Sequence, residues 1–233
     1  MNKKTFLIIE EKKFSISIFD KNLQKDIFFK EYECQINLNL KHLDLTNINK
    51  IIEENIFEIE KTNDEFLEDI YLLIDLPESQ TIDLSLDKER EGDFIQTKDI
   101  KYLVQDAKQQ ILRSYLDNDI IHIIIGSYVI NNNTYNFLPP KINCKKFAIN
   151  IKFVCFPKKI IKELKKLFHN HQIRINQILS FNYIKSFAFE DLNIGIGERA
   201  FKIINGFNKQ EVIILPKKDQ KQGFFEKLFH LFK

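Results

Sequence analysis

Histidine and glycine residues form the few patterns in this 233-residue chain that could support chemistry. His122 could act as a general base, but it lies in an apolar run, and the sequence places no carboxylate or nucleophile beside it. His169 and His171 could bind a metal, but they close a basic helix and have no acidic or cysteine neighbour. Gly195 and Gly197 could cradle a phosphate, but the flanking pattern of a nucleotide loop is missing. We therefore predict no catalytic residue, cofactor or metal site, and no enzyme activity.

Lysine and cysteine suggest no further site. A predicted helix over residues 158–170 has a lysine-rich face, but the aromatic side chains and reader motifs of nucleic-acid-binding proteins are absent. We therefore predict a solvated face and no nucleic-acid partner. Cys34, Cys144 and Cys155 are odd in number and form no Cys-x-x-Cys pair, so neither a zinc site nor a disulfide framework is indicated.

The last eleven residues, 223–233, have a strongly amphipathic helical pattern. Such a helix is ~16 Å long, too short for a hydrocarbon core of ~30 Å, so we expect it to lie in the membrane interface. Residues 217–233 contain five lysines and two acidic residues, which favours an anionic membrane surface. The predicted membrane-binding residues are Phe224, Phe225, Lys227, Leu228, Phe229, Leu231, Phe232 and Lys233. A helix docked on the chain's own core, or in a partner's groove, is the alternative.

Charge is distributed unevenly along the chain. Residues 1–100 contain 23 acidic and 13 basic residues, whereas residues 101–233 contain 10 acidic and 22 basic residues. A basic second half facing an acidic lipid or protein surface would explain this, and so would attraction between the two halves. The apolar stretch at residues 6–9 is shorter than the ~7–15 residues of a signal-peptide core. We expect a protein that is cytoplasmic or peripheral to the inner face of a membrane.

The elements that must position these residues follow from hydrophobic periodicity. Apolar runs and alternating patterns predict strands at residues 5–9, 14–19, 27–36, 70–76, 119–130, 147–156 and 173–179. Helical spacing of apolar residues predicts helices from Thr46, from Thr97 and over 158–170, and a shorter one over 197–206. The second helix has Leu112 and Tyr115 on its predicted inward face. This order predicts an α+β or α/β class with mixed sheets and helices packed against them.

Residues 69–187 resemble the bacterial actin-like cell-division protein FtsA. Asp69–Ile74 is similar to the strand before the family's inserted interaction domain, called 1C. The segment 119–130, an apolar strand with a histidine and then a tyrosine, is similar to a strand of that domain. Phe153–Pro157 and the helix after it resemble its later part, and the N-terminal strands resemble domain 1A.

The chain departs from this family at both nucleotide loops. The family's first phosphate loop would fall at Ile8–Lys12, where there is no glycine. A second loop would fall near Phe187–Asp191, and about half of the actin-like core is missing after it. We therefore expect a partial actin-like lobe that lacks ATP binding, and we transfer no nucleotide-binding residue from the family.

The resemblance implies a domain organisation. Its ranges are 1–76 for a partial domain 1A, 77–172 for domain 1C, 173–216 for the return to 1A and a C-terminal segment, 217–222 for a linker and 223–233 for the membrane helix.

The resemblance also implies a function. It predicts a peripheral adaptor on the cytoplasmic side of the bacterial inner membrane, which tethers FtsZ or other division proteins, with self-association left open. The alternatives are an actin-like protein of type IV pilus assembly, a degenerate actin-like ATPase, and a soluble scaffold whose last helix packs on its own core.

Overall fold

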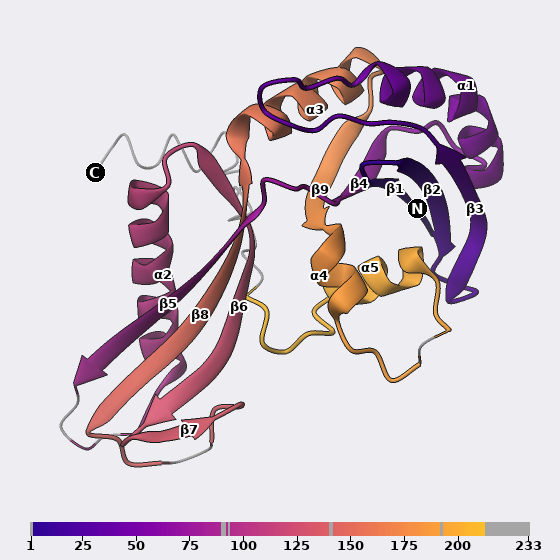
Figure 1. Ribbon diagram of the computed structural model, residues 1–233. Helices are drawn as coiled ribbons and strands as arrows, with labels where there is room; N and C mark the ends of the chain where they lie inside the picture. Colours follow the sequence, from indigo (N-terminus) through magenta and orange to yellow (C-terminus); the bar gives the residue numbers. More distant parts are fainter. Residues whose placement is uncertain (1, 90–91, 93, 140–141, 192, 213–233) are drawn as a thin grey trace, which may run out of the picture.

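A five-stranded mixed sheet forms the centre of the first unit of the fold. The computed structural model describes residues 2–89, 92, 94–139, 142–191 and 193–212 (Figure 1). The strands are β1 (Lys3–Ile9), β2 (Lys13–Asp20), β3 (Lys25–Glu33), β4 (Asp69–Ile74) and β9 (Arg174–Ser180), in the order β3-β2-β1-β4-β9. The first three strands pair antiparallel, whereas β1, β4 and β9 run parallel. The strands fall close to the ranges predicted from periodicity.

Helices cover both faces of this sheet. Helices α1 (Thr46–Asn63) and α3 (Lys158–Asn170) pack on one face, and α4 (Phe181–Ser186) and α5 (Ile196–Ile204) pack on the other (Figure 1). Strands buried on both faces need apolar side chains on both, which explains why residues 5–9 and 14–20 are buried without a break. Helix α4 was not predicted, because six residues are too few to show a helical period.

A second, antiparallel sheet is inserted between β4 and α3. It contains β5 (Gln80–Glu89), β6 (Asn118–Ile130), β7 (Asn133–Tyr135) and β8 (Lys146–Pro157), in the order β5-β8-β6-β7. Helix α2 (Thr97–Ser114) covers one face, and the opposite face is largely polar. Asn131 and Asn132 have φ values of 50° and 69°, as a tight hairpin between β6 and β7 requires.

This arrangement confirms the α+β class and a mixed sheet of the kind expected for a partial actin-like lobe with an insertion. Two details differ from the sequence predictions. Leu112 and Tyr115 are 37% and 36% exposed, because they lie at the edge of the buried face of α2. The apolar side chains of α3 lie in the core of the first sheet, although the sequence range 77–172 groups this helix with the insertion.

Gly195 and Gly197 place the start of α5 against the half-buried carboxylate of Asp26. The Gly197 N–H donates to Asp26 Oδ2 at 3.0 Å, so a carboxylate from β3 lies at the positive end of the helix. A Cβ atom on Gly197 would lie 2.5 Å from both Asp26 Oδ1 and Ser17 Oγ. These two glycines therefore allow close packing of α5 on the sheet, which explains the short motif without a phosphate.

Asp26 should make the stability of the fold depend on pH. Burial raises the pKa of Asp26, and the N–H of Gly197 offsets this only in part. The pKa of Asp26 is therefore higher in the folded protein than in the unfolded chain. Its contribution to the free energy of unfolding is complete at pH values below the unfolded-state pKa, and it is lost as the pH rises through the folded-state pKa. We expect Asp26→Asn to remove this loss. The difference between the free energies of unfolding at pH ~4 and at pH ~7 should then be smaller in the variant than in the parent.

Urea unfolding at both pH values measures the difference. The exposed residue Asp83 offers a matched control, since Asp83→Asn changes charge equally without touching α5. An unchanged pH dependence in Asp26→Asn would contradict the prediction.

Candidate functional site

The carboxyl ends of the parallel strands are the usual ligand position in a sheet of this kind. Here the two residues after β1 are Glu10 and Glu11, and the residue after β4 is Asp75. The Asp75 N–H donates to Ile9 O at 2.8 Å, which places the Asp75 and Glu10 backbones side by side. Phosphate groups would meet carboxylates there instead of the free N–H groups of a glycine loop. This edge therefore differs from a glycine-rich phosphate loop.

His122 is the most enclosed titratable side chain of the junction between the two sheets. Its side chain is fully buried, and its Nε2 accepts a hydrogen bond from the Ser180 N–H at 3.0 Å. Because Nε2 is an acceptor, the ring proton lies on Nδ1, which donates to Glu211 Oε1 at 2.7 Å. His122 is therefore a buried core histidine with both ring nitrogens bonded, and its partner carboxylate comes from 89 residues away.

The second oxygen of Glu211 is also bound. The Tyr183 O–H donates to Glu211 Oε2 at 2.8 Å, and Asn208 Nδ2 donates to the Tyr183 oxygen at 2.7 Å. Burial raises the pKa of Tyr183, so its hydroxyl stays a donor at neutral pH. We call His122, Ser180, Tyr183, Asn208 and Glu211 the latch.

Backbone pairing extends the latch along β6. The Ile125 N–H donates to Gln210 O and the Val212 N–H donates to Ile123 O, both at 2.8 Å. The segment around Glu211 therefore runs antiparallel to β6 along its outer edge. The latch joins the inserted sheet, the end of β9 with α4, and the last described residues. Its enclosed side chains suit a structural role better than a catalytic one.

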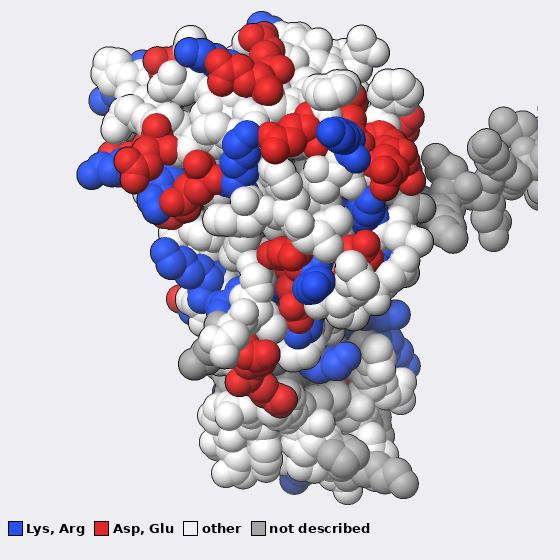
Figure 2. All heavy atoms as spheres, turned by 90° about the vertical axis from the view of Figure 1, so that its right-hand side faces the viewer, with Lys and Arg blue, Asp and Glu red and all other residues white. Residues whose placement is uncertain are grey.

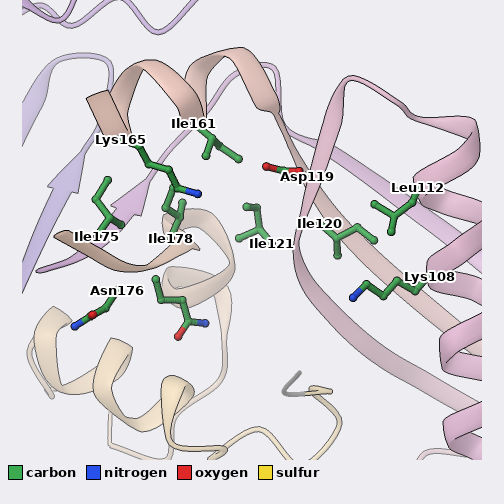
Figure 3. Close-up of a pocket in the computed structure, with 11 residues that line it drawn as sticks. Lys108, Leu112, Asp119, Ile120, Ile121, Ile161, Lys165, Ile175, Asn176 and Ile178 are labelled. Carbon is green, nitrogen blue, oxygen red and sulfur yellow. The ribbon is translucent and has the colours of Figure 1, made fainter. Parts of the chain in front are cut away.

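A groove lies beside the latch, between β6 and β9 (Figure 3). Its volume is about 450 Å³. The apolar lining comes from four elements and consists of Leu112, Ile120, Ile121, Ile161, Ile175 and Ile178. Lys108 and Lys165 lie on opposite sides of this lining, with their amino groups pointing inward (Figure 3). In the described part of the chain, β9 has only β4 as a strand neighbour, so its outer edge faces this groove.

A larger cleft, of about 760 Å³, lies on the polar face of the inserted sheet. Thr81, Gly126 and Lys152 line one side, and Lys185 and Ser186 at the end of α4 line the other. Its mixed lining suits a polypeptide segment better than a small apolar ligand.

The predicted membrane-binding residues, Phe224 to Lys233, and the linker at 217–222 lie outside the described residues. Lys162, Lys165 and Lys166 of α3 are exposed, as a solvated face requires. His171, directly after α3, has its Nε2 2.8 Å from Asn49 Oδ1 of α1. Across the residues that the structure describes, no cluster of three metal-ligating side chains occurs, and no helix is long and apolar enough to cross a bilayer.

Acidic and basic side chains alternate over the face that carries α1 and β3 (Figure 2). Three ion pairs join neighbouring segments of the first unit: Lys3 with Asp64, Lys13 with Glu31, and Lys30 with Glu58. The excess of acidic residues in the first 100 positions is therefore partly balanced locally. The described residues of this face form no patch of one sign that would attract nucleic acid or lipid.

No protein-family profile and no curated protein sequence matches the chain. Several solved structures are similar to it, among them the following three. The cytoplasmic domain of EpsL, an inner-membrane component of the type II secretion system of Vibrio cholerae, has a TM-score of 0.41 at 7% identity over 81% of this chain. A PilM–PilN type IV pilus biogenesis complex has a TM-score of 0.45 at 5% identity over 78%. A Bacteroides thetaiotaomicron protein of actin-like ATPase fold and unknown function has a TM-score of 0.33 at 13% identity over 78% of this chain.

The chain spans 60%, 48% and 54% of the lengths of those three chains. TM-scores below 0.5 at such identities leave its function open. None of the three is known as a cell-division protein.

Proposed function

We propose that this chain is a non-enzymatic adaptor that holds a protein assembly at the cytoplasmic face of a bacterial inner membrane. In this proposal residues 223–233 bind the lipid surface, and the inserted sheet with α2 binds the partner. The partner class that the FtsA resemblance implies is a division protein such as FtsZ.

One observation carries the proposal. The last described residues are fixed to the body of the protein by the latch and by two backbone hydrogen bonds to β6. A membrane-binding tail that starts from such a fixed point would hold the partner-binding sheet at a defined place near the bilayer. The carboxylates of Glu10, Glu11 and Asp75 support the absence of ATP binding, and saturable micromolar ATP binding would contradict it.

Vesicle sedimentation tests the membrane half of the proposal. We expect the full chain to sediment with vesicles that contain anionic phospholipid, and Leu228→Glu combined with Phe232→Glu to lower this partition at least tenfold. The physical reason is that two buried apolar side chains are replaced by charges, each of which costs more than 1.4 kcal/mol to place in the interface. The matched control, Glu226→Gln with His230→Gln on the polar face, should bind as the parent does. Equal sedimentation of the Leu228 and Phe232 variant would contradict the proposal.

Recruitment of FtsZ tests the partner half. We expect FtsZ filaments to collect on vesicles only when the full chain is present. Lipid binding without FtsZ recruitment would leave the membrane adaptor intact and remove the division partner. An actin-like component of pilus assembly would then be the next hypothesis.

A further inference from the structure

We propose that the exposed lysines of α3, together with Leu116 beside them, dock the folded part of the protein on an anionic lipid surface. We call Lys158, Lys159, Lys162, Lys165 and Lys166 the lysine face. The inference goes beyond the proposed function, because it places a membrane contact on the folded elements and does not rest on residues 223–233.

The lysine face forms one continuous stripe along α3. Its five members are exposed and follow one another at helical spacing, whereas Ile160, Leu164 and Phe168 on the opposite side are buried. A helix of 13 residues is ~20 Å long. Neighbouring charges along it are closer together than the screening length of ~8 Å in physiological salt. They therefore act on a nearby surface as a single basic patch.

The charge of this patch is not neutralised within the described part of the chain. The ion pairs found there join other elements, and none of them includes a member of the lysine face. Lys158 Nζ and Lys159 Nζ donate to backbone carbonyl oxygens, at 2.6 and 3.1 Å, and these acceptors leave the positive charge in place. Glu163, the one acidic residue of α3, is half-buried and lines a pocket with residues 43–46.

Leu116 provides an exposed apolar side chain beside the lysine face. It lies in the connection between α2 and β6 and is 69% exposed. Two hydrogen bonds fix this connection to the start of α3, because Lys158 Nζ donates to Leu116 O at 2.6 Å and the Lys158 N–H donates to Asp117 O at 2.8 Å. The connection and α3 lie on the same side of the molecule, at the top of Figure 1.

This combination matches the chemistry of an anionic bilayer surface. Residues 115–117 and 158–170 together contain five lysines and two acidic residues, Asp117 and Glu163, for a formal charge of +3 with His169 neutral. Lysines near an anionic leaflet are attracted by its surface potential. A leucine held at the edge of such a patch can enter the boundary between headgroups and acyl chains. The two contacts therefore favour the same placement of α3 against the lipid.

Nucleic acid and an acidic protein fit this surface less well. Grooves that bind single-stranded nucleic acid combine lysine with aromatic side chains on which bases stack. The exposed side chains of α3 include no Phe, Tyr or Trp. Protein interfaces are depleted in lysine and enriched in arginine, whereas α3 has five lysines and no arginine.

Sedimentation with vesicles of phosphatidylglycerol and phosphatidylcholine in equal parts tests the charge contact on the full chain. We expect Lys162→Gln with Lys166→Gln to lower the partition at least tenfold, because each removed lysine weakens the attraction to the anionic surface several-fold. The matched control is Lys98→Gln with Lys101→Gln, which removes the same charge from exposed positions at the start of α2 and should bind as the parent does. Unchanged partition of the Lys162 and Lys166 variant would overturn the proposal.

A second pair of variants tests the apolar contact. We expect Leu116→Glu to lower the partition at least tenfold. Phe137→Glu adds the same charge at a residue that is 68% exposed on the inserted sheet, and it should have no effect. If both glutamate variants lost binding equally, added negative charge alone would explain the loss, and Leu116 would be removed from the proposal.

Vesicles of phosphatidylcholine alone separate lipid charge from damage to the fold. On them the Lys162 and Lys166 variant should bind as the parent does, and a tenfold loss there would overturn the proposal. The variant Leu228→Glu with Phe232→Glu distinguishes this contact from the C-terminal one. Loss of anionic binding in that variant alone would reject the lysine face and retain the proposed tail, whereas loss in the lysine variant alone would do the reverse.

Discussion

Replacing Glu211 by alanine should destabilise the protein by about 3 kcal/mol, the largest effect we expect from a single substitution outside the apolar cores. The carboxylate accepts from both His122 Nδ1 and the Tyr183 hydroxyl, and its side chain is only 9% exposed. Removing it leaves two buried donors without an acceptor, each at a cost of about 1–3 kcal/mol. Urea unfolding followed by circular dichroism measures the loss.

Conservative variants separate the hydrogen bonds from the loss of packing. Glu211→Gln retains one oxygen that can accept from one of the two donors. We therefore expect it to cost about half of the destabilisation expected for Glu211→Ala. Tyr183→Phe removes one donor, and combining it with Glu211→Gln should cost less than the sum of the two single changes, because the same contact is lost in both. A Glu211→Ala protein within about 0.5 kcal/mol of the parent would show that the latch does not contribute to stability.

Gly197→Ala should destabilise the fold by about 2 kcal/mol, opposite to the usual effect of this change within a helix. The new Cβ atom would lie 2.5 Å from Asp26 Oδ1 and from Ser17 Oγ, both of which are buried on the sheet. Either α5 must move away from β2 and β3, or Asp26 must turn and lose its bond from the Gly197 N–H. Thermal unfolding gives the sign and the size of the change.

Gly126 provides the comparison within the same chain. A Cβ atom there would meet its nearest neighbour, Asn150 O, at 3.6 Å, which is ordinary contact. We expect Gly126→Ala to be neutral or stabilising by up to ~1 kcal/mol, because alanine restricts the unfolded chain. If both glycine variants had the same effect, close packing at the start of α5 would not be the cause.

Much of the fold was predictable because burial leaves a periodic signal. The strands that became β1, β2, β6 and β8 carry long apolar or alternating runs, and α1 and α2 carry helical spacing. The order of the strands in each sheet could not be predicted from periodicity, since it depends on contacts between distant segments. The resemblance to a family with an inserted domain implied the domain ranges, and the strand order is known only from the structure.

The latch could not be predicted for a physical reason. His122 and Glu211 are each unremarkable in their local sequence, and only the return of the chain to β6 brings them within 2.7 Å. One signal was present: Glu211 precedes an apolar run, and a carboxylate in such a place needs a buried partner. In the same way, the sequence argued against a phosphate loop at Gly195 and Gly197, but it could not show that Gly197 packs against a carboxylate of this chain.

The position of the latch has a mechanical consequence. The inserted sheet is connected to the first sheet by two covalent passages, after β4 and before α3. Two neighbouring chain connections alone would allow the inserted sheet to rotate about them. The latch adds a third point of attachment between the two sheets. Tension applied to the chain beyond Val212 would load the pairing with β6 and the bonds of Glu211 together. Such a force would act on both sheets at once. The two sheets would therefore move together under load and would not rotate relative to each other.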